Sequence, residues 1–249
     1  MLTEALGIKQ PGIVACVGAG GKTSLLQSLA AARKLRPVVV TSTTKMFYSQ
    51  ITQYPLVVLD EWATGIAKVR QVLERKQQVA WFSRQEGEKV IGLPASWVDK
   101  LAAALPEATI LVEADGARCC LIKAPGEQEP LIPASTTTTV GIINVSVLGQ
   151  PLLAGNTHRL ELVTQIINKQ PGEQASWQDI ARLAVHTQGI FQYARGSKIL
   201  LLSGGGTANA REAAKQIAGY VKIANVSIDR VVVTAGYGSA MQTDEVYRL

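Results

Sequence analysis

Cysteine and histidine are scarce in this chain of 249 residues, which has three cysteines and two histidines. Cys16, Cys119 and Cys120 form no C-x-x-C pair, and adjacent cysteines rarely form a disulfide with each other without backbone strain. A disulfide-rich fold is therefore not indicated, and a reducing cytoplasm fits the thiols. The roles of Cys119 and Cys120 stay open between packing and a reactive or ligand function.

Long apolar runs are also missing, since none reaches the roughly 20 residues that a membrane-spanning helix requires. The N-terminal stretch "MLTEALGIKQPG" lacks the basic and then apolar plan of a signal peptide. We therefore expect a soluble, cytoplasmic protein with no membrane partner.

Aromatic residues make up 5% of the chain, whereas the net charge is +6. The basic residues are scattered, and the longest basic cluster, "ERKQQ" at Glu74 to Gln78, has no aromatic residues interleaved with it. A surface for single-stranded nucleic acid would need such aromatic residues for stacking. We expect no nucleic-acid partner, but a general attraction to phosphates and acidic groups.

Apolar runs and helical patterns alternate along most of the sequence. Near-continuous runs such as "VVVTS", "ILVEA" and "ILLLS" are typical of strands that are buried on both faces of a mainly parallel sheet. The sequence therefore predicts a doubly wound, P-loop NTPase-like α/β fold in a single domain, with a small helical insertion possible at about residues 159–190. The predicted strands are 12–17, 37–42, 55–59, 78–82, 109–112, 138–148, 198–202 and 230–234, and the predicted helices are 22–35, 62–76, 97–104, 159–169, 177–186 and 208–222.

A glycine-rich turn follows the first predicted strand in "CVGAGGKTSLL". It departs from the phosphate-loop pattern G-x-x-x-x-G-K-[ST], because Cys16 occupies the place of the first glycine. The contracted turn still allows close backbone approach, and the helix after it directs its positive end at an anion. We expect this turn to bind ATP or GTP, although a tight strand-to-helix turn with an incidental lysine is the alternative. The predicted nucleotide-binding residues are Gly18, Ala19, Gly20, Gly21, Lys22, Thr23 and Ser24.

Two carboxylates end the predicted strand in "ILVEADGARCCLIKAP". Phosphate-loop proteins place a carboxylate beside Mg²⁺ and the attacking group at this position. We expect Asp115 and Thr23 to hold Mg²⁺, with Glu113 as a close rival to Asp115 for the metal. In catalysis, Lys22 would offset phosphate charge and Glu113 would orient water or a nucleophile. A strand that simply ends in a D-G turn is the alternative.

Hydroxyl groups and an amine follow another predicted strand in "VVVTSTTKMF". Because parallel strands end at the same sheet edge, Thr43, Thr44 and Lys45 are candidates for contact with phosphate or metal. Hydroxyl runs also occur at strand ends for structural reasons alone.

Four segments together resemble one family. "VGAGGKTSLL", "VTSTTKMF", "VEADGARCCLIKAPGEQEPLIP" and "THRLEL" occur in the order and rough spacing of the YqeC family, accessory proteins associated with selenium-dependent molybdenum hydroxylases. The resemblance covers residues 12–162. It implies a nucleotide-binding protein that acts in maturation of such a hydroxylase or its cofactor. It also directs attention to possible substrate residues: Lys123, Glu129, His158 and Arg159.

Three functions remain open from the sequence. The first is an enzyme that hydrolyses a nucleoside triphosphate, and the second is a nucleotide-gated carrier or chaperone that docks on a hydroxylase. The third is a ligase that makes an acyl phosphate, because the short glycine turn is similar to that of Mur-type ligases. The N-K-x-D pattern of guanine selection is not present, so the choice between ATP and GTP stays open.

Overall fold

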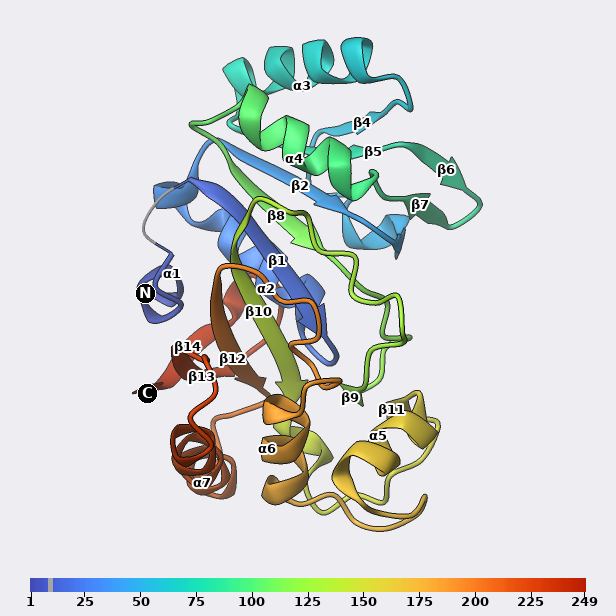
Figure 1. Ribbon diagram of the computed structural model, residues 1–249. Helices are drawn as coiled ribbons and strands as arrows, with labels where there is room; N and C mark the ends of the chain where they lie inside the picture. The colour runs from blue at the N-terminus through green and yellow to red at the C-terminus, as the bar shows by residue number, and fades with distance from the viewer. Residues whose placement is uncertain (9–10) are drawn as a thin grey trace.

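The computed structural model describes residues 1–8 and 11–249, and its centre is a nine-stranded sheet (Figure 1). The strand order is β14-β13-β12-β10-β1-β8-β2-β5-β4. Every neighbouring pair is parallel except β13 and β14. The strands are β1 (Gly12–Gly18), β2 (Val38–Ser42), β4 (Leu56–Val58), β5 (Gln78–Phe82), β8 (Thr109–Glu113), β10 (Thr136–Asn144), β12 (Ser197–Ser203), β13 (Arg230–Ala235) and β14 (Gln242–Arg248).

Helices cover both faces of this sheet. Side chains alternate along β1, so that Ile13 packs with the helices on one face and Val14 packs with those on the other. Helices α1 and α2 cover the second face, and α3 to α7 cover the first; Figure 1 shows α2 behind the sheet. The helices are α1 (Leu2–Ala5), α2 (Lys22–Ala31), α3 (Trp62–Lys76), α4 (Ala95–Ala104), α5 (Leu160–Ile167), α6 (Trp177–Val185) and α7 (Ala208–Ile223).

This arrangement confirms the predicted doubly wound α/β class. The order of the strands does not test the further prediction of a P-loop NTPase-like fold, which concerns the glycine turn described below. Two helices, α5 and α6, occupy the range where an insertion was expected, and they contact each other. Among the described residues, no helix has both the length and the apolar character needed to cross a membrane.

Two small sheets that were not predicted lie outside the main sheet. The first is antiparallel and has the order β3-β7-β6, and in the second β9 pairs with β11 in parallel. Their strands are too short to show an apolar period in the sequence. The strands are β3 (Lys45–Phe47), β6 (Arg84–Glu86), β7 (Lys89–Ile91), β9 (Ile122–Lys123) and β11 (Thr157–His158).

Two predicted elements end four residues earlier than expected. Helix α2 ends at Ala31, because Ala32 is extended and Arg36 takes the extended backbone that precedes a proline. Strand β10 ends at Asn144, whose side chain accepts a hydrogen bond from the Ser146 N–H and starts a short 3-10 turn.

The central strand β1 lies at the point where the chain reverses its direction across the sheet. From β1 the chain passes through α2 to β2 on one side, and from β8 it later passes to β10 on the other side. Open α/β sheets bind ligands at the carboxyl ends of strands at such a switch point. The glycine turn after β1 and the two carboxylates at the end of β8 meet there.

Candidate functional site

The backbone of the glycine turn requires glycine at two positions. Gly18 has φ +94° and Gly20 has φ +76°, in the left-handed region that side chains disfavour. A Cβ atom at Gly18 would lie 2.3 Å from the carbonyl oxygen of Ile142, and one at Gly20 would lie 2.4 Å from Cβ of Asn144. The turn is therefore tightly packed on the end of β10.

Backbone N–H groups of the turn remain available to a ligand. Within the described part of the chain, the N–H groups of Gly20 and Gly21 donate no hydrogen bond. Helix α2 begins at Lys22, and the first N–H groups of a helix have no partner inside it. Gly21 provides no side-chain cap. Together these groups form a site that favours an anion.

Lys22 turns its ammonium toward this centre. Its side chain is 5% exposed, and Nζ donates a hydrogen bond to the carbonyl oxygen of Gly18. Nζ also lies 3.1 Å from Oδ1 of Asp115 and 3.9 Å from Oε1 of Glu113. Burial acts to lower the pKa of Lys22, but the two carboxylates outweigh it and raise the pKa above the ordinary lysine value. The ammonium therefore stays charged.

Asp115 joins the glycine turn to a second lysine. It is buried, and its Oδ2 accepts the N–H of Gly18 at 2.9 Å and lies 2.9 Å from Nζ of Lys123. Its Oδ1 lies near Lys22 but receives no hydrogen bond from any described residue. The ion pair with Lys22 is thus the one contact of this oxygen with a charged group in the described residues.

Glu113 is the last residue of β8 and is buried on the α2 side of the sheet. Burial raises its pKa to about 7, against the smaller opposing effect of Lys22. Among the described residues, none donates a hydrogen bond to its Oε2. A buried carboxyl with a pKa near neutrality is suited to accept and release a proton.

These residues fit a magnesium-bound polyphosphate. The carboxylate oxygens of Asp115 and Glu113 are the hard ligands that Mg²⁺ prefers, and Oε2 of Glu113 has no partner in the described residues. The N–H groups of the turn suit phosphate oxygens. Thr23 and Ser24 lie half-buried in the first turn of α2. No group of three or more His, Cys, Asp or Glu able to hold a metal occurs in the described residues; Mg²⁺ usually binds to one or two carboxylates plus substrate phosphates.

Lys123 and Arg159 extend the ion pairs away from the turn. The ammonium of Lys123 donates to the Gly116 carbonyl at 2.7 Å and pairs with Asp115 at 2.9 Å and with Glu129 at 3.0 Å. Arg159 binds both oxygens of Glu129, at 2.6 and 2.7 Å. Although burial opposes ionisation, hydrogen bonds from Arg159 and the charge of Lys123 lower the pKa of Glu129 to about 2. Glu129 is therefore a carboxylate whose oxygens are already engaged.

The "TSTTK" residues are divided between two places. Thr43 donates its hydroxyl to the Leu131 carbonyl, and Thr44 shares a hydrogen bond with the neighbouring Ser42. Lys45 does not join the Lys22 cluster: it pairs with Glu86 at 2.8 Å on the small β3-β7-β6 sheet. The chain leaves the main sheet at Lys45, which carries this side chain outward.

Sequence reasoning missed Asn144 and Ser203, which hold the glycine turn in place. Both side chains donate a hydrogen bond to the carbonyl oxygen of Gly20. They are the last residues of β10 and β12. Each of them is a polar residue that ends a buried apolar strand, as Glu113 is, and this pattern in the sequence could have identified them.

The three thiols have different surroundings. Cys16 is buried in β1, and burial raises its pKa far above the ordinary thiol value. Cys119 is exposed and Cys120 is buried, and burial also raises the pKa of Cys120. Cys119 and Arg118 both have positive φ, so the loop after Asp115 bends sharply here.

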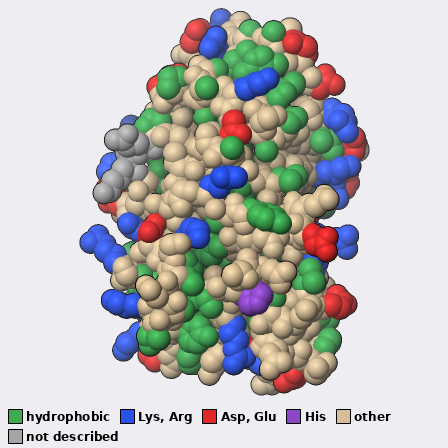
Figure 2. Space-filling model, viewed as in Figure 1, with side chains coloured by type: hydrophobic (Ala, Val, Ile, Leu, Met, Phe, Trp, Pro, Cys, Tyr) green, Lys and Arg blue, Asp and Glu red, His purple; other side chains and the backbone are tan. Residues whose placement is uncertain are grey.

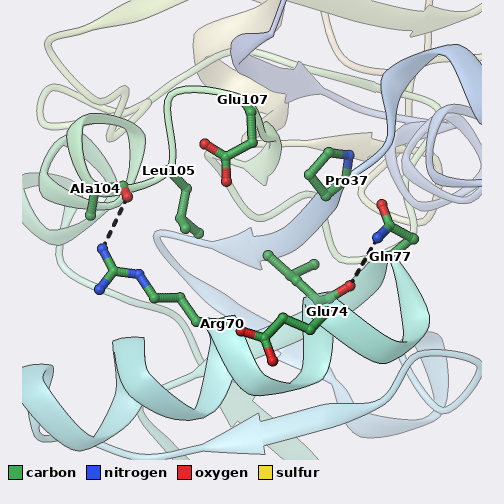
Figure 3. A pocket seen from close by; sticks show the side chains of 8 residues that line it. Pro37, Arg70, Glu74, Gln77, Ala104, Leu105 and Glu107 are labelled. Carbon is green, nitrogen blue, oxygen red and sulfur yellow. Dashed lines mark hydrogen bonds between the residues drawn. The ribbon is translucent and has the colours of Figure 1, made fainter.

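The surface away from this site offers two further observations. Figure 2 shows lysine and arginine side chains dispersed over one face without a continuous basic stripe. A hollow of about 490 Å³ lies at the opposite, amino-terminal edge of the sheet (Figure 3). Arg70 spans part of it and donates to the Ala104 carbonyl at 3.2 Å. The hollow is therefore separate from the cluster around Lys22.

The fold and site define a doubly wound α/β protein with a contracted glycine turn and a buried lysine–carboxylate cluster at its switch point. More particularly, the chain belongs to the YqeC family: the family model described as "YqeC protein" matches residues 14–161. The chain is also similar to a protein of Escherichia coli (strain K12) described as "Uncharacterized protein YqeC". The two are 33% identical over 194 residues, which cover 74% of this chain and 72% of the relative. The family match includes the turn, the carboxylates and the ion pairs as far as Arg159.

Proposed function

We propose that the protein binds a nucleoside triphosphate, ATP or GTP, together with Mg²⁺ at the glycine turn, and hydrolyses it. One observation carries this proposal. Gly20 and Gly21, whose N–H groups donate no hydrogen bond within the described residues, directly precede Lys22, and the buried Lys22 ammonium lies 3.1 Å from Oδ1 of Asp115 and 3.9 Å from Oε1 of Glu113. Donors for phosphate and acceptors for a cation therefore meet at one point.

Each residue has a distinct part in this proposal. Lys22 balances the charge that develops on the outer phosphates, and a phosphate oxygen must replace at least one of its present acceptors. Asp115 and Thr23 would hold Mg²⁺, which neutralises phosphate charge when bound. Glu113, with a pKa of about 7, takes the proton of the attacking water.

The proposed biological role is as an accessory factor in maturation of a selenium-dependent molybdenum hydroxylase or its cofactor. Its support is membership of the YqeC family, together with the resemblance of the four motif segments to that family. The cytoplasm is the compartment we propose, because all three cysteines are free thiols.

Calorimetric titration with ATP and GTP, with and without Mg²⁺, tests nucleotide binding. Lys22→Met should weaken binding about tenfold to hundredfold, the usual worth of a charge-assisted hydrogen bond. Because Lys22→Met also removes one cation from beside two buried carboxylates and can affect folding, Thr23→Val is the second variant and should remove the Mg²⁺-dependent part of the affinity. Lys76→Met, at the far end of α3, is the matched control and should bind as the wild type does.

A turnover assay separates hydrolysis from binding alone. We expect Glu113→Gln to bind the nucleotide with nearly unchanged affinity and to lose most of the hydrolysis. Tight binding without turnover in the wild type would instead indicate a nucleotide-gated carrier. No binding of either nucleotide by the folded wild type would refute the proposal.

A further inference from the structure

His158 lies at the outer end of the ion pairs described above, and its side chain has no hydrogen-bond partner among the residues that the structure describes. The pairing of β11 with β9 places His158 opposite Lys123. The ring is half-buried, and within the described residues it makes no hydrogen bond through either nitrogen. Neither ring nitrogen is among the buried atoms of the described residues that lack a partner, so both are accessible to solvent and to a ligand.

Lys123 is the register partner of His158 and Arg159 is its neighbour in the chain. The charged groups near enough to act on the pKa of the ring are three cations, Lys123, Arg159 and Arg118, and one carboxylate, Glu129. Glu129 is not free to pair with the ring, because Arg159 engages both its oxygens and Lys123 shares one. The ring therefore lies near three cations, and among the described residues the one carboxylate near it is already paired with Lys123 and Arg159. The pKa of His158 falls to about 4, first because of burial and then because of the three cations.

The cations differ in what they can offer a ligand. Lys123 is 1% exposed, and the three N–H donors of its ammonium all have protein acceptors. It is therefore a positioning residue. Arg159 is 29% exposed and uses part of its five N–H donors on Glu129. Arg118 is exposed and forms no ion pair within the described part of the chain.

We propose that His158, Arg159 and Arg118 form a binding site for an oxyanion, either a carboxylate or a phosphate group. Lys123 links this site to Asp115 and so to the glycine turn. We assign the oxyanion to the second substrate, and this assignment rests on the proposed nucleotide chemistry. Oxyanion binding itself does not depend on nucleotide chemistry.

The chain has two histidines, so the NMR resonances of the His158 ring can be assigned and followed individually. Histidine ring resonances in the full chain are followed by NMR through a pH titration, without added anion, with inorganic phosphate and with acetate. Either anion, if bound, should raise the pKa of His158 by about one unit or more, because it offsets the three cations. The titration curve of His186, whose Nδ1 accepts the Gln188 N–H elsewhere in the molecule, should not respond.

Arg118→Gln tests the assignment, with Arg33→Gln on the exposed 3-10 helix as the matched control. In Arg118→Gln the pKa of His158 without anion should rise, because one repulsive charge is lost, and the further rise caused by the anion should largely disappear. Arg33→Gln should retain the full anion effect. An effect of phosphate alone would indicate a phosphate group on the substrate, and an effect of both anions would indicate a site that also takes a carboxylate.

Two results would overturn the proposal. One is a pKa of His158 that neither anion changes, and the other is an anion effect that survives Arg118→Gln undiminished. Nucleotide binding by calorimetry is measured independently of these resonances, so the failure of either proposal can be recognised without the other.

Discussion

Lys123→Met removes the buried ammonium that joins Asp115 to Glu129, while it keeps a similar side-chain volume. In the wild type this ammonium is 1% exposed and lies 2.9 Å from Asp115 and 3.0 Å from Glu129. It also donates a hydrogen bond to the Gly116 carbonyl at 2.7 Å. The variant therefore leaves the buried Asp115 carboxylate and the half-buried Gly116 carbonyl oxygen without their common partner.

The magnitude follows from that loss. Removing one member of a buried ion pair costs about 3–5 kcal/mol of folding free energy when the other charge is left without compensation. Asp115 keeps Lys22 at 3.1 Å and Glu129 keeps Arg159, so we expect a loss near the lower end, about 3 kcal/mol. For a domain of this size that corresponds to a decrease in the melting temperature of about 6–12 °C.

Urea unfolding followed by circular dichroism measures this free energy. Lys45→Met is the matched control, because Lys45 pairs with Glu86 at 2.8 Å but both side chains are exposed. Water screens that pair, so its removal should change the stability far less than Lys123→Met does. Equal effects of the two substitutions would refute the assignment of Lys123 as the buried link.

Two further predictions concern pH and the glycine turn. The folded-state pKa of Glu113 is raised from 4.5 to about 7. Between these two pH values the folded protein therefore holds a proton that the unfolded chain has released. The contribution of Glu113 to stability consequently declines as the pH rises from 4.5 to about 7. The free energy of urea unfolding, measured across this pH interval, should fall more steeply with pH in the wild type than in Glu113→Gln. The same dependence on pH in both proteins would contradict the prediction. Gly18→Ala should destabilise the protein strongly, since its Cβ would lie 2.3 Å from the Ile142 carbonyl oxygen, whereas Gly87→Ala, with φ +57° and no atom within 4 Å, carries backbone strain alone. Similar melting temperatures for these two variants would contradict the packing described for the turn.

The main sheet was predictable because its strands are buried on both faces. Runs such as "VVVTS" and "ILLLS" are apolar throughout, and β2 and β12 lie where they occur. β14 escaped prediction because it is a polar edge strand, "QTDEVYR", with no buried residues. β9 and β11 have two residues each and depend on a pairing between distant segments. Local patterns cannot show such a pairing.

The site was predictable only in part, for the same reason. Strand ends are visible in the sequence, so the sheet topology brought Lys22 close to Glu113 and Asp115 as their positions suggested. The engagement of Lys123 and Glu129 with each other depends on loop geometry, which the sequence does not specify. Lys45 was placed with the nucleotide site by its position after a strand, and the short β3 strand instead carries it to Glu86.

The central claim is that the glycine turn binds phosphate through its free backbone donors. Amide NMR spectra of isotope-labelled protein, recorded during addition of ATP or GTP with Mg²⁺, test it at those atoms. We expect the N–H resonances of Gly20 and Gly21 to move downfield on saturation, with Lys22 and Thr23 following. If a nucleotide binds while these four resonances stay in place, the phosphates lie elsewhere and the turn is not the phosphate site.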